Sequence, residues 1–348
     1  MPFEIERYSS HTAAPQRGAA GVGVADGIVI GLVNNMPDAA LEATEAQFAR
    51  LLGAAADSTP VRLRLAFLPE VPRGSAGLEH LESHAYWPID TLLRERVDAL
   101  IVTGMEPVAA VLSDEPYWGR MGQLIEWAET NTTSTIWSCL AAHAAVEHLD
   151  GIRRRRLERK RCGVFAHATL ENEPLLEGVG TPLYTPHSRW NELPVDALRN
   201  AGYTIVSSCA ATGADMFIRQ TRSLFIFFQG HPEYEEATLL REYRRDVGRF
   251  LRGQQPHYPT LPHEYFSPAA LDFLSAFEQR ALAAPSADLL AEFPVNAIAD
   301  TLRNTWGTGA ARIYRNWLAR LAGARNTAAT LRTTLVTPPS AKVSSSGL

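Results

Sequence analysis

Residues 134–143 have the sequence STIWSCLAAH, in which a short apolar segment leads directly into a helix-forming one. The pattern predicts a buried strand over Thr135–Ser138 and a helix over Leu140–Leu149. Cys139 lies at the junction, where a strand-to-helix turn exposes a side chain at the carboxyl edge of a sheet. A helix amino terminus favours a thiolate and can bind an oxyanion. The segment therefore indicates a cysteine nucleophile, with a buried structural cysteine as the alternative.

Strands and helices alternate through the part of the chain that precedes and includes this segment. That alternation predicts an α/β fold with a mostly parallel sheet and helices on both faces, followed by a helical C-terminal extension. The expected strands are Gly27–Val33, Val61–Phe67, Ala99–Val102, Cys162–Thr169, Leu183–Pro186, Tyr203–Ser207, Met216–Gln220 and Leu224–Gln229. The other expected helices are Ala40–Ala54, Trp118–Glu129, Glu235–Leu251, Pro268–Leu282 and Val295–Leu321.

Composition divides the chain into four parts. Residues 1–25 are rich in small and polar residues and predict a loose N-terminal arm, and residues 26–252 are expected to form a catalytic domain. A break rich in proline begins the segment 253–335, which is expected to be helical and to pack on the catalytic domain. Residues 336–348 contain few apolar side chains and predict a disordered tail.

Charge and cysteine usage exclude several classes of protein. The net charge of −5 over 348 residues gives no support to a nucleic-acid partner. No apolar stretch reaches the roughly 18–20 residues that span a bilayer, and the start of the chain does not read as a secretion signal. Cys139, Cys162 and Cys209 have wide, irregular spacing, which suggests neither a disulfide framework nor a metal site. We expect a cytoplasmic protein with a usable thiol.

One locally basic run stands out. It comprises Arg153–Arg156 with Arg159, Lys160 and Arg161. It predicts either a solvated loop or helix end, or an anion site for a phosphorylated cofactor. Lysine occurs only at positions 160 and 342, so a lysine-dependent step has almost no candidates.

A second segment supplies a base. Residues 228–234 read FQGHPEY and follow an apolar strand. His231 and Glu233 are two residues apart, so in extended backbone they project to the same side and the carboxylate can orient the imidazole. A surface histidine in a turn is the alternative interpretation. His187 is a competing base, and the residues alone do not choose between them.

Two arginines are candidate clamps for a carboxylate. Arg189 and Arg245 each offer a planar guanidinium that suits bidentate recognition of an amino-acid carboxylate. A surface ion pair is the alternative for each.

Several motifs occur in the same order as in a known family. They are Asn34-x-Met36-Pro37, Thr44-Glu45-x-Gln47-Phe48-x-Arg50, Val102-Thr103-Gly104, Tyr117-Trp118, Cys139-x-Ala141, Gly163-Val164-Phe165, Pro186-His187-Ser188-Arg189, Gly230-His231-Pro232-Glu233-Tyr234 and Asn316-Trp317-Leu318. In these motifs the chain resembles the homoserine O-acyltransferase family of methionine biosynthesis, of the homoserine O-succinyltransferase type. That family has a fold related to class I glutamine amidotransferases.

The resemblance implies a role for each candidate residue. The implied roles are Cys139 as the acylated nucleophile, His231 as general base, Glu233 as its orienting carboxylate, the Leu140 backbone amide as oxyanion donor, and Arg245, Arg189 and Ser188 as substrate-binding residues. His187 then becomes a structural or substrate-shell residue.

The implied activity is acyl transfer from succinyl-CoA or acetyl-CoA to homoserine through an acyl-cysteine. The resemblance implies small-molecule substrates, no permanently bound cofactor, no metal and no membrane, and it allows a homodimer. Two other functions stay open, a glutamine amidohydrolase and a catalytically silent metabolite-binding relative.

The chain departs from the relatives at three places. Relatives carry a lysine just after the Met-Pro pair, where this chain has Asp38–Leu41 and no lysine nearby. Leu140 replaces a tryptophan, and the loop Met105–Val108 matches neither the acetyl nor the succinyl version.

Overall fold

The computed structural model describes residues 3–9 and 27–336, with side chains up to residue 327. Its main sheet consists of β1 (Phe3–Ile5), β2 (Ile28–Val33), β3 (Val61–Phe67), β4 (Trp87–Pro88), β5 (Ala99–Val102), β6 (Ser134–Ser138), β9 (Thr204–Ile205), β12 (Met216–Gln220) and β13 (Leu224–Phe228). In this part of the chain the strand order is β1-β3-β2-β5-β6-β13-β12-β9, with β4 beside β3. The pairs from β1 to β13 are parallel, and β12 and β9 add an antiparallel edge. The predicted α/β class is confirmed.

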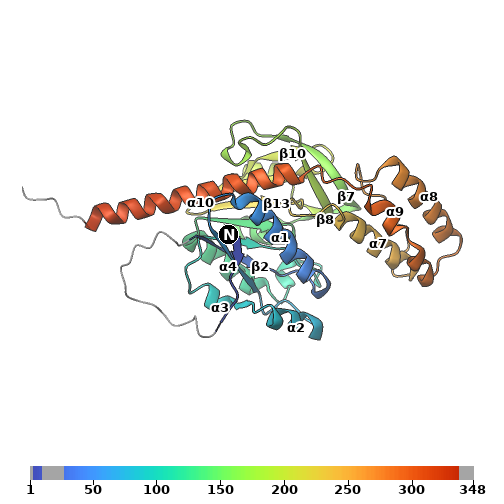
Figure 1. Cartoon of the computed structure of the whole chain (residues 1–348), viewed down its shortest axis with the longest axis horizontal. Coiled ribbons are helices and arrows are strands. Elements are labelled where there is room, and N and C mark those ends of the chain that lie inside the picture. The colour runs from blue at the N-terminus through green and yellow to red at the C-terminus, as the bar shows by residue number, and fades with distance from the viewer. Residues whose placement is uncertain (1–2, 10–26, 337–348) are drawn as a thin grey trace, which may run out of the picture.

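Helices cover both faces of this sheet (Figure 1). One face packs against α3 (Ile89–Leu92), α4 (Trp118–Asn131) and α5 (Leu140–Asp150). The other packs against α1 (Leu41–Ala56) and α10 (Gly307–Val336). In β13, Phe225 and Phe227 enter the first core while the alternate residues enter the second, as the two-residue period of a strand requires.

A smaller sheet stands beside the main one. It contains β7 (Arg155–Thr169), β8 (Leu183–Glu192), β10 (Ser207–Cys209) and β11 (Gly213–Ala214), in the order β11-β10-β7-β8. The remaining helices are α2 (Ser75–Ser83), α6 (Val195–Asn200), α7 (Thr238–Leu251), α8 (Pro268–Ala283) and α9 (Val295–Ala299). Helices α7, α8 and α9 share a third core with Val164 of β7.

Several expected elements differ from the structure. Arg155–Arg161 lie in strand β7, so a loop or helix end was wrong for most of the basic run. The expected helix Val295–Leu321 is two helices, α9 and α10. Strand β8 runs to Glu192 instead of ending at Pro186.

The predicted terminal segments are only partly described. Phe3–Ile5 form β1 at the sheet edge, although residues 1–25 were expected to be a loose arm. The rest of the arm from residue 10, and residues 337–348 of the predicted tail, lie outside the described residues. Among the described helices, none combines the length and apolar character needed to cross a membrane.

Candidate active site

Cys139 occupies a sharp turn between β6 and α5. Its backbone has φ 53° and ψ −114°, a conformation that non-glycine residues rarely adopt. The Cys139 amide donates to Phe228 O at 2.7 Å, and its carbonyl accepts from Ala142 N at 3.0 Å. The turn is therefore held from the neighbouring strand and from the helix, as in a nucleophile elbow.

The register of the sheet brings the base to this cysteine. Ser138 pairs with Phe228 in the parallel β6–β13 ladder, so the residues that follow each strand meet at the same edge. His231 Nδ1 lies 2.7 Å from Glu233 Oε1, and the Cys139 side chain lies close enough to the imidazole to raise its pKa. The structure thus brings together the predicted thiol, base and carboxylate.

The surroundings of His231 favour its protonated form. Burial opposes the charge, but the Glu233 carboxylate and the Cys139 sulfur outweigh it and raise the pKa of His231 well above its usual value. The Tyr234 ring stacks on the imidazole with centroids 4.2 Å apart.

The Leu140 amide faces the Thr103-Gly104 loop that follows β5. As the first residue of α5, Leu140 has an amide that no helical carbonyl can reach. A Cβ atom added to Gly104 would lie 3.1 Å from Leu140 N and 3.5 Å from Cys139 Cβ. Glycine at 104 therefore keeps the space in front of this amide open.

The turn that carries His231 is supported by two buried polar side chains that sequence reasoning missed. Asp215 Oδ1 accepts from Gly230 N at 3.1 Å, and Asp215 O accepts from Gln229 N at 2.8 Å. The Gln229 side chain accepts from Leu193 N at 2.8 Å and lies 3.0 Å from His143 Nε2 on α5. Both side chains are fully buried, so they tie the base-bearing turn to the helix behind the thiol.

His187 and Arg189 are enclosed behind this turn. His187 is fully buried, and its Nε2 lies 3.4 Å from Asp215 Oδ1. Burial lowers the pKa of His187 to about 4 despite that carboxylate. Arg189 donates to His187 Nδ1 at 3.2 Å, to Asn191 O at 2.6 Å and to Thr212 O at 2.5 Å. Much of the Arg189 guanidinium is therefore engaged within the protein.

Arg245 and Ser188 meet in a separate polar cluster. Arg245 Nε donates to Asp246 Oδ1 at 3.1 Å, and Ser188 donates to Glu242. Glu242 also accepts from Tyr234 Oη at 2.7 Å, and Tyr234 is the residue that stacks on His231. Tyr234 therefore links this cluster to the His231 imidazole.

This cluster also contains a lysine. Lys160 Nζ donates to Asp246 Oδ2 at 2.7 Å and lies 3.7 Å from Glu242 Oε2. The sequence suggested no lysine near the site, because position 160 is far from the Met36-Pro37 motif along the chain. The β7 strand brings it there.

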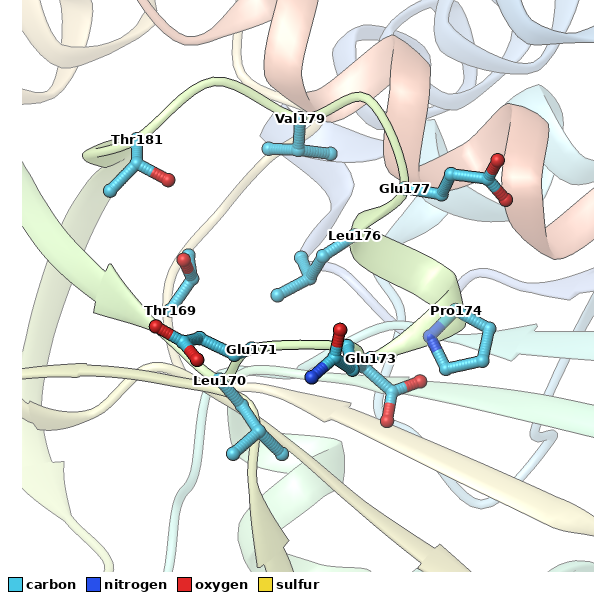
Figure 2. A pocket seen from close by; sticks show the side chains of 10 residues that line it. Thr169, Leu170, Glu171, Glu173, Pro174, Leu176, Glu177, Val179 and Thr181 are labelled. Atoms are coloured by element: carbon cyan, nitrogen blue, oxygen red, sulfur yellow. The ribbon is translucent and has the colours of Figure 1, made fainter.

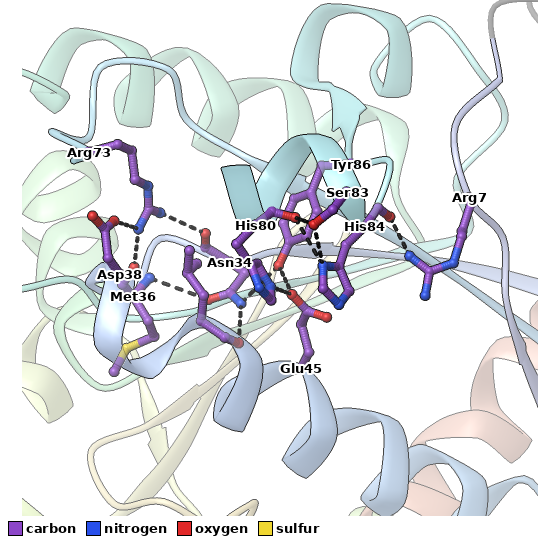
Figure 3. Close-up of polar contacts among 11 residues, drawn as sticks. Arg7, Asn34, Met36, Asp38, Glu45, Arg73, His80, Ser83, His84 and Tyr86 are labelled. Atoms are coloured by element: carbon purple, nitrogen blue, oxygen red, sulfur yellow. Dashed lines mark hydrogen bonds and ion pairs between the residues drawn. The ribbon is translucent and has the colours of Figure 1, made fainter. Parts of the chain in front are cut away.

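A second cation, Arg73, contacts the segment 34–38 from another part of the chain. Arg73 donates to Met36 O and, at 3.2 Å, to Asn34 O, and it lies 3.4 Å from Asp38 (Figure 3). Its side chain is only 3% exposed. Arg73 lies between β3 and α2, so no local pattern connects it with this segment.

Two further features lie apart from the predicted residues. A hollow of about 620 Å³ is formed by residues 169–181, carries three glutamates and contains none of the predicted site residues (Figure 2). Within the described residues, possible metal ligands gather within 4.8 Å in two groups, Glu45 with His80 and His84, and His167 with His187 and Asp215. The absence of a metal from the reaction stays a prediction.

The comparisons with known proteins place the chain among named enzymes. A family description, homoserine O-succinyltransferase, matches residues 16–325. A homoserine O-succinyltransferase from Rhodopseudomonas palustris is 49% identical over 313 residues, which cover 90% of this chain and 92% of that protein. Another from Bradyrhizobium japonicum is 46% identical, over 85% of this chain and 90% of that protein.

Solved structures give a more distant likeness. A glutamine amidotransferase from Thermotoga maritima aligns with a TM-score of 0.43 and 12% identity, over 85% of this chain and 98% of that chain. A glutamine amidotransferase from Methylobacillus flagellatus aligns with a TM-score of 0.45 and 16% identity, over 84% and 94%.

Proposed function

The chain belongs to the homoserine O-succinyltransferase family, and on that basis we propose that it transfers an acyl group from acyl-CoA to homoserine through a thioester on Cys139. The observation that carries this proposal is the contact of Cys139 with His231, which Glu233 orients from the other side. The three groups are a nucleophile, a proton carrier and its orienting carboxylate.

The first half-reaction begins with the proton on His231 and a thiolate at Cys139. The raised pKa of His231 supports this resting state, as does the position of the sulfur at the start of α5. The sulfur attacks the thioester carbonyl, a bond forms between Cys139 Sγ and the acyl carbon, and the bond from that carbon to the coenzyme A sulfur breaks. His231 gives its proton to the departing thiolate.

The second half-reaction reverses these roles. Neutral His231 takes the proton of the homoserine hydroxyl, whose oxygen attacks the acyl-cysteine. The ester bond forms, the bond between Cys139 and the acyl carbon breaks, and the thiolate–imidazolium pair is restored. No further co-reactant is needed.

The Leu140 amide stabilises the oxyanion in both steps. An oxyanion donor of this type contributes about 3 kcal/mol to the transition state. The open space beside Gly104 supports this assignment, because it lies against both Leu140 N and the Cys139 side chain.

Arg245 is proposed to bind the homoserine carboxylate. Its side chain is 48% exposed and lies in the cluster that contacts Tyr234. Ser188 contributes to the same cluster through Glu242. Arg189 is proposed to support the substrate-binding residues without clamping the substrate itself, because its guanidinium already donates to backbone carbonyls.

Succinyl-CoA is the proposed donor, and acetyl-CoA is the alternative. The names of the relatives support succinyl transfer. We also propose a cytoplasmic location, where acyl-CoA is made and thiols stay reduced. A homodimer and a role in methionine biosynthesis stay predictions.

The decisive experiment is a panel of donors and acceptors followed by release of the coenzyme A thiol. The donors are succinyl-CoA and acetyl-CoA, and the acceptors are homoserine, serine and glutamine. Mass spectrometry of the wild type with donor alone is expected to show an acyl group on Cys139. Cys139→Ala should abolish transfer, whereas Cys209→Ala, a matched cysteine outside the site, should retain it.

Other outcomes would point elsewhere. An unmodified Cys139 during turnover would rule out the covalent mechanism. Ammonia release from glutamine without consumption of acyl-CoA would identify an amidohydrolase.

A further inference from the structure

A large cavity is lined by residues of β7, β8, α7 and the segment 255–263. Its volume is about 1010 Å³, which is at the upper end of the range for ligand pockets. It lies outside the Cys139–His231–Glu233 group, and none of those three residues lines it.

An irregularity in β7 turns basic residues toward this cavity. The β7–β8 ladder passes from the pair Arg156↔Asn191 to the pair Arg161↔Arg189, so β7 advances five residues while β8 advances two. Bulges of this kind redirect side chains that regular strands would alternate between faces. As a result, consecutive β7 residues including Arg159, Lys160 and Arg161 all line the cavity.

Two of these cations have donors to spare. Among the described residues, Arg159 makes no ion pair or side-chain hydrogen bond and is exposed. Arg161 approaches Glu192 only at 3.9 Å, and its buried Nε has no hydrogen-bond partner. Lys160 is different, because Asp246 already binds it. Arg159 and the unbonded Nε of Arg161 therefore keep donors available, and guanidinium suits phosphate oxygens.

An exposed aromatic ring faces the same space. Trp190 lies opposite the irregular part of β7, lines the cavity and is 44% exposed. The Arg156 guanidinium carbon lies 5.1 Å from the Trp190 ring centroid. A tryptophan left this open in the same cavity as Arg159 and Arg161 offers a platform on which a nucleobase can stack.

The cavity also borders the polar cluster that contains Arg245, Ser188 and Glu242. Asp246 and Cys162 line it, and Cys162 pairs with Ser188 in the β7–β8 ladder. Ser188 contacts Glu242, which binds Tyr234 beside His231. An extended ligand in the cavity would therefore reach the polar cluster that contacts Tyr234 beside the imidazole.

We propose that this cavity binds the phosphorylated adenine-nucleotide half of the acyl-CoA donor, with its phosphates on Arg159 and Arg161 and its base on Trp190. This inference rests on the proposed function, since it requires a coenzyme A donor. It assigns a role to Arg159 and Arg161, whose side chains line the cavity.

The test is calorimetric titration of the full-length protein with free coenzyme A and with 3′,5′-ADP, which represents the nucleotide half alone. The variants are the double substitution Arg159→Gln/Arg161→Gln, and Trp190→Ala with Trp190→Phe as its conservative counterpart. The matched control is Arg199→Gln/Arg222→Gln, which removes the same charge from exposed positions outside the cavity. Thermal unfolding of each variant checks that the fold is intact.

Both ligands should bind the Arg159/Arg161 variant and Trp190→Ala at least about tenfold more weakly than the wild type. Trp190→Phe and the arginine control should bind nearly as tightly as the wild type. In steady-state assays the KM for acyl-CoA should rise by a similar factor while kcat at saturation is retained, because the thiol and its base are untouched.

Unchanged coenzyme A binding in both variants would overturn the inference, and continued acyl transfer would then leave the proposed function intact. A fall in kcat without a change in KM would also overturn it. Failure of the proposed function has a different signature, in which the wild type neither binds coenzyme A nor becomes acylated at Cys139, and that result would reject both.

Discussion

The backbone at Cys139 is strained, and this conformation exposes the Cys139 side chain at the edge of the sheet. A non-glycine residue with φ near 53° costs about 1–3 kcal/mol. The hydrogen bonds from Cys139 N to Phe228 O and from Ala142 N to Cys139 O stabilise the turn against that cost. This turn places the sulfur at the amino terminus of α5, where it raises the pKa of His231.

At position 231 opposing effects set the protonation state. Burial lowers the pKa of the imidazole, while Glu233 and Cys139 raise it and prevail. Because the folded pKa is raised, the imidazolium form persists to higher pH than in the unfolded chain. The ion pair with Glu233 therefore stabilises the fold fully below the unfolded pKa and stops doing so as the pH rises through the folded pKa.

This balance predicts the effect of Glu233→Gln. The substitution removes the largest effect that raises the pKa of His231, so the basic limb of the rate of Cys139 acylation should move to lower pH. The rate at its optimum should fall about 10²-fold, because the orienting carboxylate is lost. Rapid-quench measurement of acylation across pH is the appropriate assay.

Glu236→Gln is the control, since Glu236 is exposed on the same segment. An unchanged pH profile in Glu233→Gln would contradict the assigned role of Glu233.

At the scale of elements, parallel pairing assembles the site. Strands β5, β6 and β13 are adjacent and parallel, so their carboxyl ends deliver Gly104, Cys139 and the His231 turn to one edge of the sheet. Each strand ends at nearly the same level, because Val102 pairs with Trp137 and Ser138 with Phe228.

Gly104→Ala tests this shared edge. The new methyl group would lie 3.1 Å from Leu140 N and would crowd the proposed oxyanion position. We expect kcat to fall about 10²-fold, as for loss of an oxyanion donor, with little change in KM.

Gly119→Ala in α4 is the matched control, since a Cβ atom there meets nothing within 4 Å. It should leave activity unchanged and stabilise the helix by about 0.5–1 kcal/mol. Full activity in Gly104→Ala would show that the space beside Leu140 N is not used.

At the scale of the whole molecule, the C-terminal region braces the site. Trp306 Nε1 donates to Tyr234 O at 2.7 Å, and Trp317 Nε1 of α10 donates to Ser134 Oγ on β6 at 3.0 Å. Both tryptophans are buried. The helical extension therefore contacts both the strand before the thiol and the residue that stacks on the base.

Trp306→Phe should distinguish the effect of the Trp306 hydrogen bond on the site from the effect of Trp306 packing on stability. Loss of the hydrogen bond to Tyr234 O is expected to reduce the free energy of unfolding by about 1 kcal/mol, with some added cost from the smaller ring. The acylation rate should fall as well, because Tyr234 holds the His231 ring.

Urea unfolding and acylation kinetics would be compared with Trp127→Phe, which is half-buried on α4. A stability loss with an unchanged acylation rate would limit the C-terminal region to a packing role.

Much of the fold could be predicted because its elements carry local signals. The buried runs at Ile28–Val33 and Leu224–Phe228 and the strand–Cys139–helix junction depend on neighbouring residues alone. Spacing also indicated the His231–Glu233 pair. The basic strand Arg155–Arg161 was missed, because a charged, half-exposed strand lacks an apolar period.

Local sequence was enough to predict the apolar strands of the main sheet, the turn at Cys139 and the residues that we propose carry out acyl transfer. Which of two histidines meets the thiol, that Asp215 supports Gly230, that Arg73 reaches Met36 and that Lys160 joins Asp246 depended on strand order and register. Such contacts join residues far apart in the chain. They form because a folded interior must pair its polar groups with whatever partners the packed elements bring near, and no local pattern records which those are.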